Sequence, residues 1–509
     1  MPVLLEGTRF GWKIAWVVLI CLPGCGEQQR PERPAVSQPL ERVDGHPSEG
    51  REAGWESAPP RPDALEASSG GQESNHSSAE QVPVPPLASV PERNVDEQAL
   101  REIGIEVFRS RSLILLVDQV SPEERIEFAQ LPHLVDAWIE WLAGAYPELL
   151  RQAERETLLP LTGHVMREPA LFVQAGLLPE ELADLNHGKD RGRDFWLVDQ
   201  PTHYYRRHLL LHEALHCVMN ARPHQWPVWY LEGMAERMAI HERDGAGRTA
   251  FAMMPDKLHV EGGFGRIGLL REEVRAGRFR TLTDVQKLDF GNFYPHKTSY
   301  AWSWAFCYFL SRHPATAEDF TTLTSARQSR DFHSRLKQLL SRESSRLEAD
   351  WAVFLNNLVP GYDFENSRIH WNAPDADDAE PPGTTRDFSV QVNRHWQNSG
   401  ISVTAGTRYR ISAEGHYVLG VDPLPWESEP QGVSLAYVSG RPRGELQMVL
   451  YQPGDSSPAR DFGFTTVIPV GRQREWQAPT DGTLFFRINE IPSEWGDNTG
   501  PLRVRVMQP

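Results

Sequence analysis

The stretch RRHLLLHEALH occupies residues 206–216 and places His212 and His216 four positions apart. On a helix this spacing puts both imidazoles on one face, one turn from each other. Two such side chains can bind one Zn²⁺ through their ring nitrogens at about 2.0–2.1 Å. Glu213 follows the first histidine and can face a water on that metal. The stretch therefore predicts a helix that carries a zinc site.

A second predicted helix begins in the segment PVWYLEGMAE, residues 227–236, and holds an acidic residue, Glu232, sixteen positions after His216. Together the two segments resemble the gluzincins, zinc peptidases of the MA type with an HExxH motif and a later Glu in a W-x-x-E-G-x-A-E segment. The resemblance implies that His212, His216 and Glu232 bind zinc and that Glu213 is the catalytic base. Three protein ligands leave the fourth position of a tetrahedral zinc open, as in catalytic sites.

The same resemblance assigns roles to two further residues. Glu236, one helical turn after Glu232, would orient a ligand histidine; the alternative is a solvated glutamate on the helix face. Tyr300 heads a predicted buried helix with a Y-x-x-x-W pattern and would donate to the oxyanion of the tetrahedral intermediate; the alternative is a packed core tyrosine. His208 lies on the helical face of the two ligand histidines, where we expect a core histidine or one that supports the ligands.

Composition and charge exclude two classes of protein. Four cysteines in 509 residues exclude a fold built on disulfides. In an oxidising compartment Cys217 and Cys307 either pair or remain two buried free thiols. The 52 Lys+Arg against 69 Asp+Glu, a net charge of −17, exclude a nucleic-acid partner, because phosphate binding needs a basic surface.

Residues 96–364 have the patterns of one α+β domain. Apolar stretches predict strands at 103–107, 113–117 and 193–200, and a helical pattern runs from 122 to 141. The resemblance implies a zincin-like fold for this domain. It also leads us to expect, by analogy, that the strand at 194–200 pairs with an extended substrate.

The C-terminal part of the chain changes its pattern. Residues 365–385 are polar and rich in Pro and Asp, which predicts a linker. From 386 to 509 apolar residues alternate with polar ones, for example at Leu502, Val504 and Val506. This period of two predicts an all-β sandwich.

One segment of the tail, INEIPSEWGDNTG at 488–500, is similar to the metal loop of the small calcium-dependent galactose-binding lectins of bacteria. The resemblance implies a jelly-roll, galactose-binding-like sandwich, a glycan partner and a Ca²⁺ site, since hard oxygen ligands suit calcium. The implied ligands are the side chains of Glu490, Asp497 and Asn498 and the backbone carbonyl of Glu494. The alternative is a sandwich that keeps this loop for folding alone.

The N-terminus predicts export and a lipid anchor. Two basic residues precede an apolar stretch at 14–22, which is too short to span a bilayer as a helix and fits a secretory signal. The following LPGC resembles the lipobox of bacterial lipoproteins, which implies that residues 1–24 are removed and that Cys25 is lipidated. Gly26, where an Asp is absent, favours the outer membrane. Residues 25–95, rich in Pro, Glu, Ser and Gly, predict a disordered tether.

These patterns lead to one expectation and one rival. We expect a membrane-tethered extracytoplasmic zinc peptidase that hydrolyses peptide bonds of a protein or peptide substrate, with Glu213 acting on a zinc-bound water and the lectin-like module targeting the enzyme. The rival is a surface glycan-binding lipoprotein, an adhesin, whose peptidase domain is inactive. The intact set of ligands and Glu213 favours the enzyme. Neither substrate preference nor endo- or exopeptidase action follows from the motifs.

Overall fold

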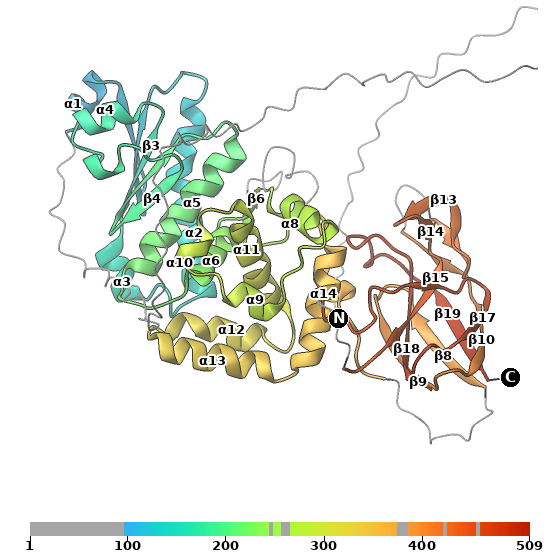
Figure 1. The fold of residues 1–509 in the computed structure, drawn as a ribbon. Coiled ribbons are helices and arrows are strands. Elements are labelled where there is room, and N and C mark those ends of the chain that lie inside the picture. The colour runs from blue at the N-terminus through green and yellow to red at the C-terminus, as the bar shows by residue number, and fades with distance from the viewer. Residues whose placement is uncertain are drawn as a thin grey trace, which may run out of the picture. The chain divides into compact units, whose positions relative to one another are not determined.

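The structure is a computed structural model of the chain (Figure 1). It describes residues 96–243, 248–255, 265–373, 385–420, 425–454 and 459–508. The predicted signal sequence, the predicted lipidation site Cys25 and the tether at 25–95 lie outside these ranges, as does much of the predicted linker. Within them, no helix is both long and apolar enough to cross a lipid bilayer. The described chain combines a mixed α/β region with a C-terminal region of antiparallel sheets, as the sequence predicts.

A five-stranded sheet in the order β1-β2-β3-β5-β4 organises the first region. Strands β2, β3 and β5 run parallel, and β1 and β4 are antiparallel strands at the two edges. The strands are β1 Ile105–Arg109, β2 Leu113–Asp118, β3 Leu161–Met166, β4 Gly188–Arg191 and β5 Asp194–Val198. The predicted strands at 113–117 and 193–200 are thereby confirmed. In β2, Leu115 belongs to one core cluster and Leu116 to another, because successive side chains point to opposite faces of the sheet.

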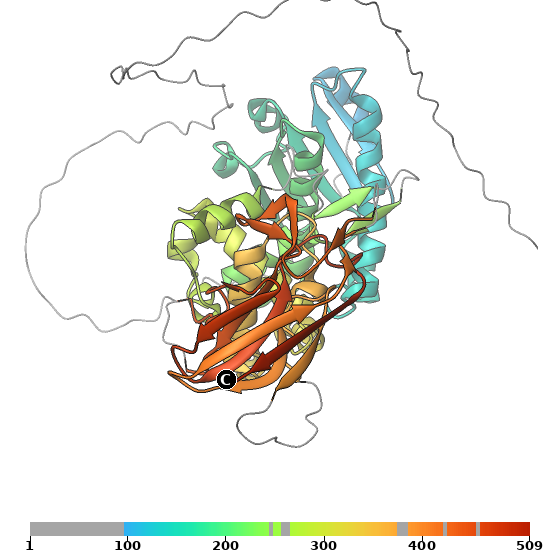
Figure 2. The ribbon, with the colours of Figure 1, turned by 90° about the vertical axis from the view of Figure 1, so that its right-hand side faces the viewer.

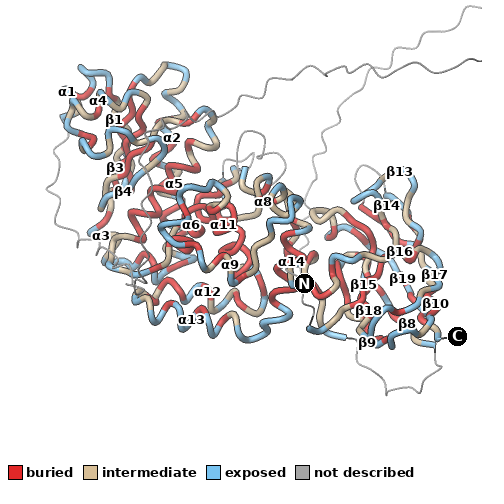
Figure 3. The backbone as a smooth tube through the Cα atoms, in the orientation of Figure 1, coloured by how far each residue is buried: buried red, intermediate tan, exposed pale blue. Residues whose placement is uncertain are grey.

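Helices pack on this sheet and on each other. Helices α2 and α5 contact the strands, and α6 contacts both α5 and α11 (Figure 1). The helices are α1 Glu97–Glu102, α2 Arg125–Ala145, α3 Gln152–Leu158, α4 Pro169–Gln174, α5 His203–Asn220, α6 Val228–Met238, α8 Arg266–Arg275, α9 Leu282–Gln286, α10 Phe290–Phe293, α11 Lys297–Arg312, α12 Ala317–Thr322, α13 Ser329–Ser341, α14 Ser344–Asn357 and α15 Phe364–Ser367, with short 3₁₀ turns at Glu180–Leu182 and Leu323–Ser325. Strands β6 His241–Arg243 and β7 Thr249–Phe251 pair with each other. Most of α11 is buried, so this helix lies within the core (Figure 3).

A partly buried ionic network holds the start of α5 against the sheet. Thr202 caps the helix by accepting a hydrogen bond from the backbone N–H of Tyr205. One turn further, Arg206 pairs with Asp199, just after β5, at 2.5 Å for Nε–Oδ1 and 2.9 Å for Nη2–Oδ2. Arg167, just after β3, binds the same carboxylate at 2.8 Å. Bidentate charge pairs fix direction as well as distance, so the first turn of α5 is tied to the ends of β3 and β5.

Two four-stranded antiparallel sheets, β17-β10-β19-β8 and β16-β15-β18-β9, form the C-terminal region, whose strands are orange and red in Figure 2. Their strands are β8 Arg386–Gln391, β9 Gln397–Val403, β10 Arg408–Glu414, β15 Leu446–Tyr451, β16 Ile468–Pro469, β17 Gln473–Gln477, β18 Gly482–Ile488 and β19 Pro501–Met507. Two smaller pairs join β11 Tyr417–Val418 with β12 Glu427–Ser428, and β13 Val433–Val438 with β14 Arg441–Arg443.

The predicted alternation of this region is confirmed. Along β19, Leu502, Val504 and Val506 are buried and the residues between them are exposed. Val504 shares one core cluster with Phe486 of β18, which lies in the other sheet. The two sheets therefore bury their apolar faces in a common core, as in a sandwich.

The first residues of the predicted linker form hydrogen bonds with elements on both sides of it in the sequence. Asp350 of α14 accepts hydrogen bonds from the backbone of Ile369 at 3.0 Å and from the indole N–H of Trp371 at 2.8 Å. The backbone N–H of His370 donates to the carbonyl of Trp396 at 2.8 Å. Up to residue 371, this segment is held by both α14 and the β-rich region.

Candidate metal centre

Three buried side chains from two helices bring their donor atoms together. His212 and His216 extend from the same face of α5, and their Nε2 atoms lie 3.1 Å apart. Glu232 reaches them from α6, with Oε2 3.2 Å from Nε2 of His212 and 3.4 Å from Nε2 of His216. The three residues are only 5 %, 8 % and 7 % exposed. The structure thus gathers the three predicted ligands at one point.

The donor atoms have the spacing of a tetrahedral zinc site. Ligand atoms 2.0–2.1 Å from a tetrahedral zinc lie about 3.3 Å from each other. The three separations here are 3.1, 3.2 and 3.4 Å. Two imidazole nitrogens that face each other and one carboxylate oxygen at such distances need a cation or protons between them. The residues therefore fit a metal ion bound by two nitrogens and one oxygen.

Glycine in the E-G-x-A segment allows α6 to approach α11. A Cβ at position 233 would lie 2.5 Å from the carbonyl oxygen of Ser303 and 2.7 Å from Sγ of Cys307. Any larger residue than Gly233 would push the two helices apart. Since Glu232 precedes this contact, the close packing of the helices determines where its carboxylate lies.

The two cysteines of this region do not form a disulfide. Cys217 on α5 and Cys307 on α11 are both free and buried. Burial raises the pKa of the Cys307 thiol, so it stays protonated and unreactive. Of the two alternatives that the sequence leaves open, the pair of buried free thiols is the observed one.

Glu213 lies beside the cluster and against the backbone of an edge strand. A Cβ at Gly188 of β4 would lie 2.2 Å from Oε1 of Glu213, so the carboxylate packs where only glycine leaves room. Burial raises the pKa of Glu213 to about 8. The expectation that the strand at 194–200 pairs with substrate is wrong, because β5 is bonded to β3 on one side and to β4 on the other. The strand at the edge beside Glu213 is β4.

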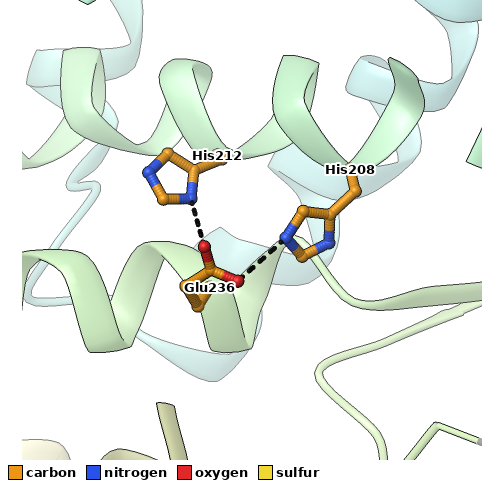
Figure 4. Close-up of side chains that lie close together, drawn as sticks. All are labelled: His208, His212 and Glu236. Atoms are coloured by element: carbon orange, nitrogen blue, oxygen red, sulfur yellow. Dashed lines mark hydrogen bonds and ion pairs between the residues drawn. The ribbon is translucent and has the colours of Figure 1, made fainter. Parts of the chain in front are cut away.

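Glu236 lies on the other side of His212 (Figure 4). Its Oε1 is 3.7 Å from Nδ1 of His212, while Oε2 is 3.3 Å from Nε2 of His208. Arg266 of α8 binds the same carboxylate through two nitrogens, at 2.7 Å and 3.1 Å. His208, His212 and Glu236 could by composition hold a second metal, but a guanidinium already neutralises this carboxylate. The place of Glu236 suits the predicted role of orienting His212, and His208 is a buried neighbour in the same arrangement.

Two tyrosines lie near the cluster, and the sequence singles out only one of them. The phenol of Tyr294, just after α10, donates to Oε1 of Glu232 at 3.2 Å. Tyr294 is 51 % exposed, so this residue borders solvent as well as the cluster. Tyr300, the predicted residue, packs its ring against Phe293 and under the guanidinium of Arg266. Tyr294 lies outside the Y-x-x-x-W pattern, and only the fold brings it to Glu232.

Side chains of the residues named as calcium ligands lie near one another in the sandwich, with a guanidinium among them, although the predicted ligand of Glu494 is its backbone carbonyl. Nε of Arg443 is 2.7 Å from Oε1 of Glu490, and its Nη2 is 3.2 Å from Oε2 of Glu494. Asn498 donates to Oε2 of Glu490 at 3.1 Å. Asp497 borders the same group, because a Cβ at Gly420 would be 3.1 Å from its Oδ2 and 3.9 Å from Nη2 of the arginine. Neither metal-capable group found among the described residues lies in this loop.

Comparisons with known proteins give distant likenesses. No family model matches the chain, and no curated protein matches it. The N-terminal domain of EclA, a PllA-like lectin, is similar at 23 % identity and a TM-score of 0.19, over 24 % of this chain and 95 % of that one. The IMPa metallopeptidase from Pseudomonas aeruginosa is similar at 11 % identity and a TM-score of 0.15, over 78 % of this chain and 46 % of that one.

A second IMPa structure, in complex with an O-glycopeptide, is similar at 12 % identity and a TM-score of 0.15, over 79 % of this chain and 42 % of that one. This chain therefore spans less than half the length of IMPa. These neighbours include a metallopeptidase and a lectin, and all the TM-scores lie far below 0.5. The function proposed below accordingly rests on the side chains of this chain.

Proposed function

We propose that the chain is a zinc-dependent peptidase of the gluzincin type, held outside the cytoplasm. The observation that carries this proposal is the convergence of three buried donor atoms, from His212, His216 and Glu232, at the spacing of a tetrahedral metal site. Three protein donors leave one position open, which distinguishes a catalytic zinc site from a structural one. The zincin-like fold of residues 96–364 is part of the proposal.

Glu213 is the residue that moves the proton. When bound, the zinc supplies a Lewis acid that polarises the scissile carbonyl and makes water nucleophilic near neutral pH. Glu213 accepts a proton from the attacking water and delivers it to the leaving amine. Its carboxylate suits this role because it is buried beside the three ligands but pairs with none of them in the described residues. Glu236 keeps His212 in the orientation that presents Nε2 to the metal.

Tyrosine hydroxyls are the donors proposed for the oxyanion of the tetrahedral intermediate. A donor that points at the developing negative charge stabilises the transition state. The resemblance implies Tyr300, but the phenol of Tyr294 is the one that reaches the ligand Glu232, and this residue also borders solvent. We assign the role to Tyr294 and keep Tyr300 as the competing assignment.

An extended peptide can reach these residues along β4. Among the described residues this strand, at the edge of the sheet, has a neighbour on one side only, so its other edge can add a strand from a substrate. Gly188 places the backbone of that strand directly against Glu213. The proposed substrate is therefore a protein or peptide bound in extended form.

The sequence patterns of the remaining parts of the chain support a location of this activity at a surface. Lipidation of Cys25 and a tether over 25–95 would hold the enzyme at a bacterial membrane, with the outer membrane favoured. The sandwich at 386–509 would be a lectin-like, jelly-roll module that targets the enzyme to glycans. An adhesin with an inactive peptidase domain is the rival, and the complete ligand set with Glu213 argues against it.

Metal content and cleavage together test the proposal. The full chain and its Glu232→Ala variant are purified, their zinc is measured by elemental analysis, and both are incubated with a mixture of denatured proteins whose fragments are identified by mass spectrometry. We expect one zinc per wild-type chain and cleavage that the variant loses together with the metal. Glu272→Ala on the exposed face of α8 is the matched control. A folded wild-type chain without zinc, or with zinc but without any cleavage, would refute the proposal that the chain is a zinc-dependent peptidase.

A further inference from the structure

The loop that resembles a calcium site already contains a cation of its own. Arg443 ends β14, and its side chain is only 12 % exposed. It contacts Glu490, whose side chain is completely buried, at 2.7 Å, and Glu494 at 3.2 Å. The guanidinium also lies 5.9 Å from the ring centroid of Trp426, within the range of a cation–π contact. Two carboxylates and an aromatic ring thus surround one permanent positive charge.

The hydrogen bonds of Asn498 leave little for a metal. Its Nδ2 donates both to Oε2 of Glu490 at 3.1 Å and to the carbonyl of Val392 at 3.2 Å. Both partners are acceptors, so the amide must present its nitrogen to them rather than its oxygen. The Oδ1 of Asn498 is buried and has no hydrogen-bond partner among the described residues, but a calcium site here would also need Glu490, both of whose oxygens face other partners.

Calcium needs six to eight oxygen ligands at about 2.3–2.6 Å. Here one oxygen of Glu490 faces Arg443 and the other faces the Asn498 amide nitrogen. A second cation at this point would lie beside the guanidinium and repel it. The described residues therefore do not fit calcium as long as Arg443 keeps its place.

We propose that Arg443 takes the place that calcium has in the resembled lectins. Its guanidinium balances the negative charge of the carboxylates in the loop, so the sandwich needs no metal ion there. The guanidinium holds the loop at 490–498 to β14 through two carboxylates of that loop. The guanidinium supplies the positive charge that the carboxylates of the loop require, so this loop needs no calcium to form. Any glycan binding by the sandwich is then independent of calcium.

Calcium titration of the wild-type chain is the first test. The zinc-loaded full chain is titrated with CaCl₂ by isothermal calorimetry and melted with and without about 1 mM Ca²⁺, since a ligand that binds only the folded state raises the melting temperature. We expect no heat of binding and no rise. Binding of one Ca²⁺ per chain that Glu490→Gln abolishes would overturn the proposal. Chelators are omitted because they would also remove zinc.

Removing the guanidinium is the second test. Arg443→Met leaves the buried Glu490 without its cation, so we expect the melting temperature of the sandwich to fall by about 5 °C or more, and Ca²⁺ to restore part of the loss. Arg410→Met is the matched control, because Arg410 pairs with Glu475 on the surface of the same sandwich. An Arg443→Met chain that melts like the wild type would overturn the proposal. Should this variant not fold, the wild-type titration still decides.

Discussion

The α5–α6 cluster and the loop at 490–498 of the sandwich both contain buried carboxylates. The two regions differ in the basic side chains that face these carboxylates. In the first, Glu232 faces two imidazoles at 3.2 Å and 3.4 Å. In the second, Glu490 faces a guanidinium at 2.7 Å. An imidazole can give up its proton and offer a lone pair to a metal, whereas a guanidinium stays protonated and cannot. Similar charge balances thus accompany a candidate metal centre in one region and, by our proposal, a metal-free pair in the other.

Glu236 combines both kinds of partner. Arg266 binds it as Arg443 binds Glu490, while His212 and His208 approach it from α5. The arginine pairs with this carboxylate through two nitrogens, while Nδ1 of His212 lies 3.7 Å from it and Nε2 of His212 lies beside His216 and Glu232. A carboxylate that is paired with a guanidinium could therefore orient a ligand histidine without binding the metal itself.

The largest expected effect is on kcat, and it tests whether the α5–α6 cluster is catalytic. Glu213→Gln should lower kcat by about 10³-fold, because an amide cannot accept the proton of the attacking water. Zinc content should stay at the wild-type level, since no ligand changes. Steady-state kinetics and elemental analysis on the same sample measure both. Glu272→Gln, at an exposed residue of α8, is the control; unchanged turnover in Glu213→Gln would mean that another residue is the base.

The two tyrosines give the next largest effect. Tyr294→Phe should reduce kcat by about 10²-fold, as expected for the loss of one oxyanion donor, while zinc content and KM change little. Tyr300→Phe, measured in parallel, should have the smaller effect because its ring packs between Phe293 and Arg266. The reverse order would return the role to Tyr300.

Substitution of Glu236 tests whether a carboxylate that is paired with an arginine strengthens zinc binding through the ligand histidine. Glu236→Gln should weaken zinc affinity by about 10–100-fold, the usual cost of removing a carboxylate that orients a ligand histidine. Competition with a chromophoric chelator measures this affinity directly. Activity should return at saturating zinc, because the three ligands and Glu213 remain. If this variant has the wild-type zinc affinity, Glu236 does not orient His212 and serves only as the ion-pair partner of the buried Arg266.

The last prediction concerns the pH dependence of zinc binding by the α5–α6 cluster. Burial lowers the pKa of His216, but the Glu232 carboxylate outweighs it and raises this pKa to about 9 in the metal-free protein. Zinc must then displace a proton at neutral pH, so apparent zinc affinity should rise about tenfold per pH unit up to pH 9 and fall on acidification.

Metal-free stability should follow the opposite direction. The raised pKa of His216 stabilises the folded apo protein below pH 6.5, and this contribution is lost as the pH rises through 9. Zinc titrations and thermal melts between pH 6 and 9 check both expectations; a zinc affinity independent of pH would show that His216 is neutral before the metal arrives.

Local patterns in the sequence predicted the parts of the molecule that depend on neighbouring residues. The four-residue spacing of His212 and His216 places them on one face because a helix turns once in 3.6 residues, and the structure has them so. The alternation at Leu502, Val504 and Val506 predicted a strand with one buried face for the same kind of reason. These relations hold within a single element, and no other part of the chain is needed to establish them.

Tertiary structure alone decided which distant residues meet. That β4 rather than β5 is the edge strand, that Tyr294 reaches Glu232, and that Arg443 enters the acidic loop all depend on how separate elements pack. Arg443 is 47 positions from Glu490 in the sequence, and no periodicity relates residues so far apart. Backbone geometry determines a side chain's direction only within its own helix or strand, whereas its partners across elements follow from the packing of the whole core.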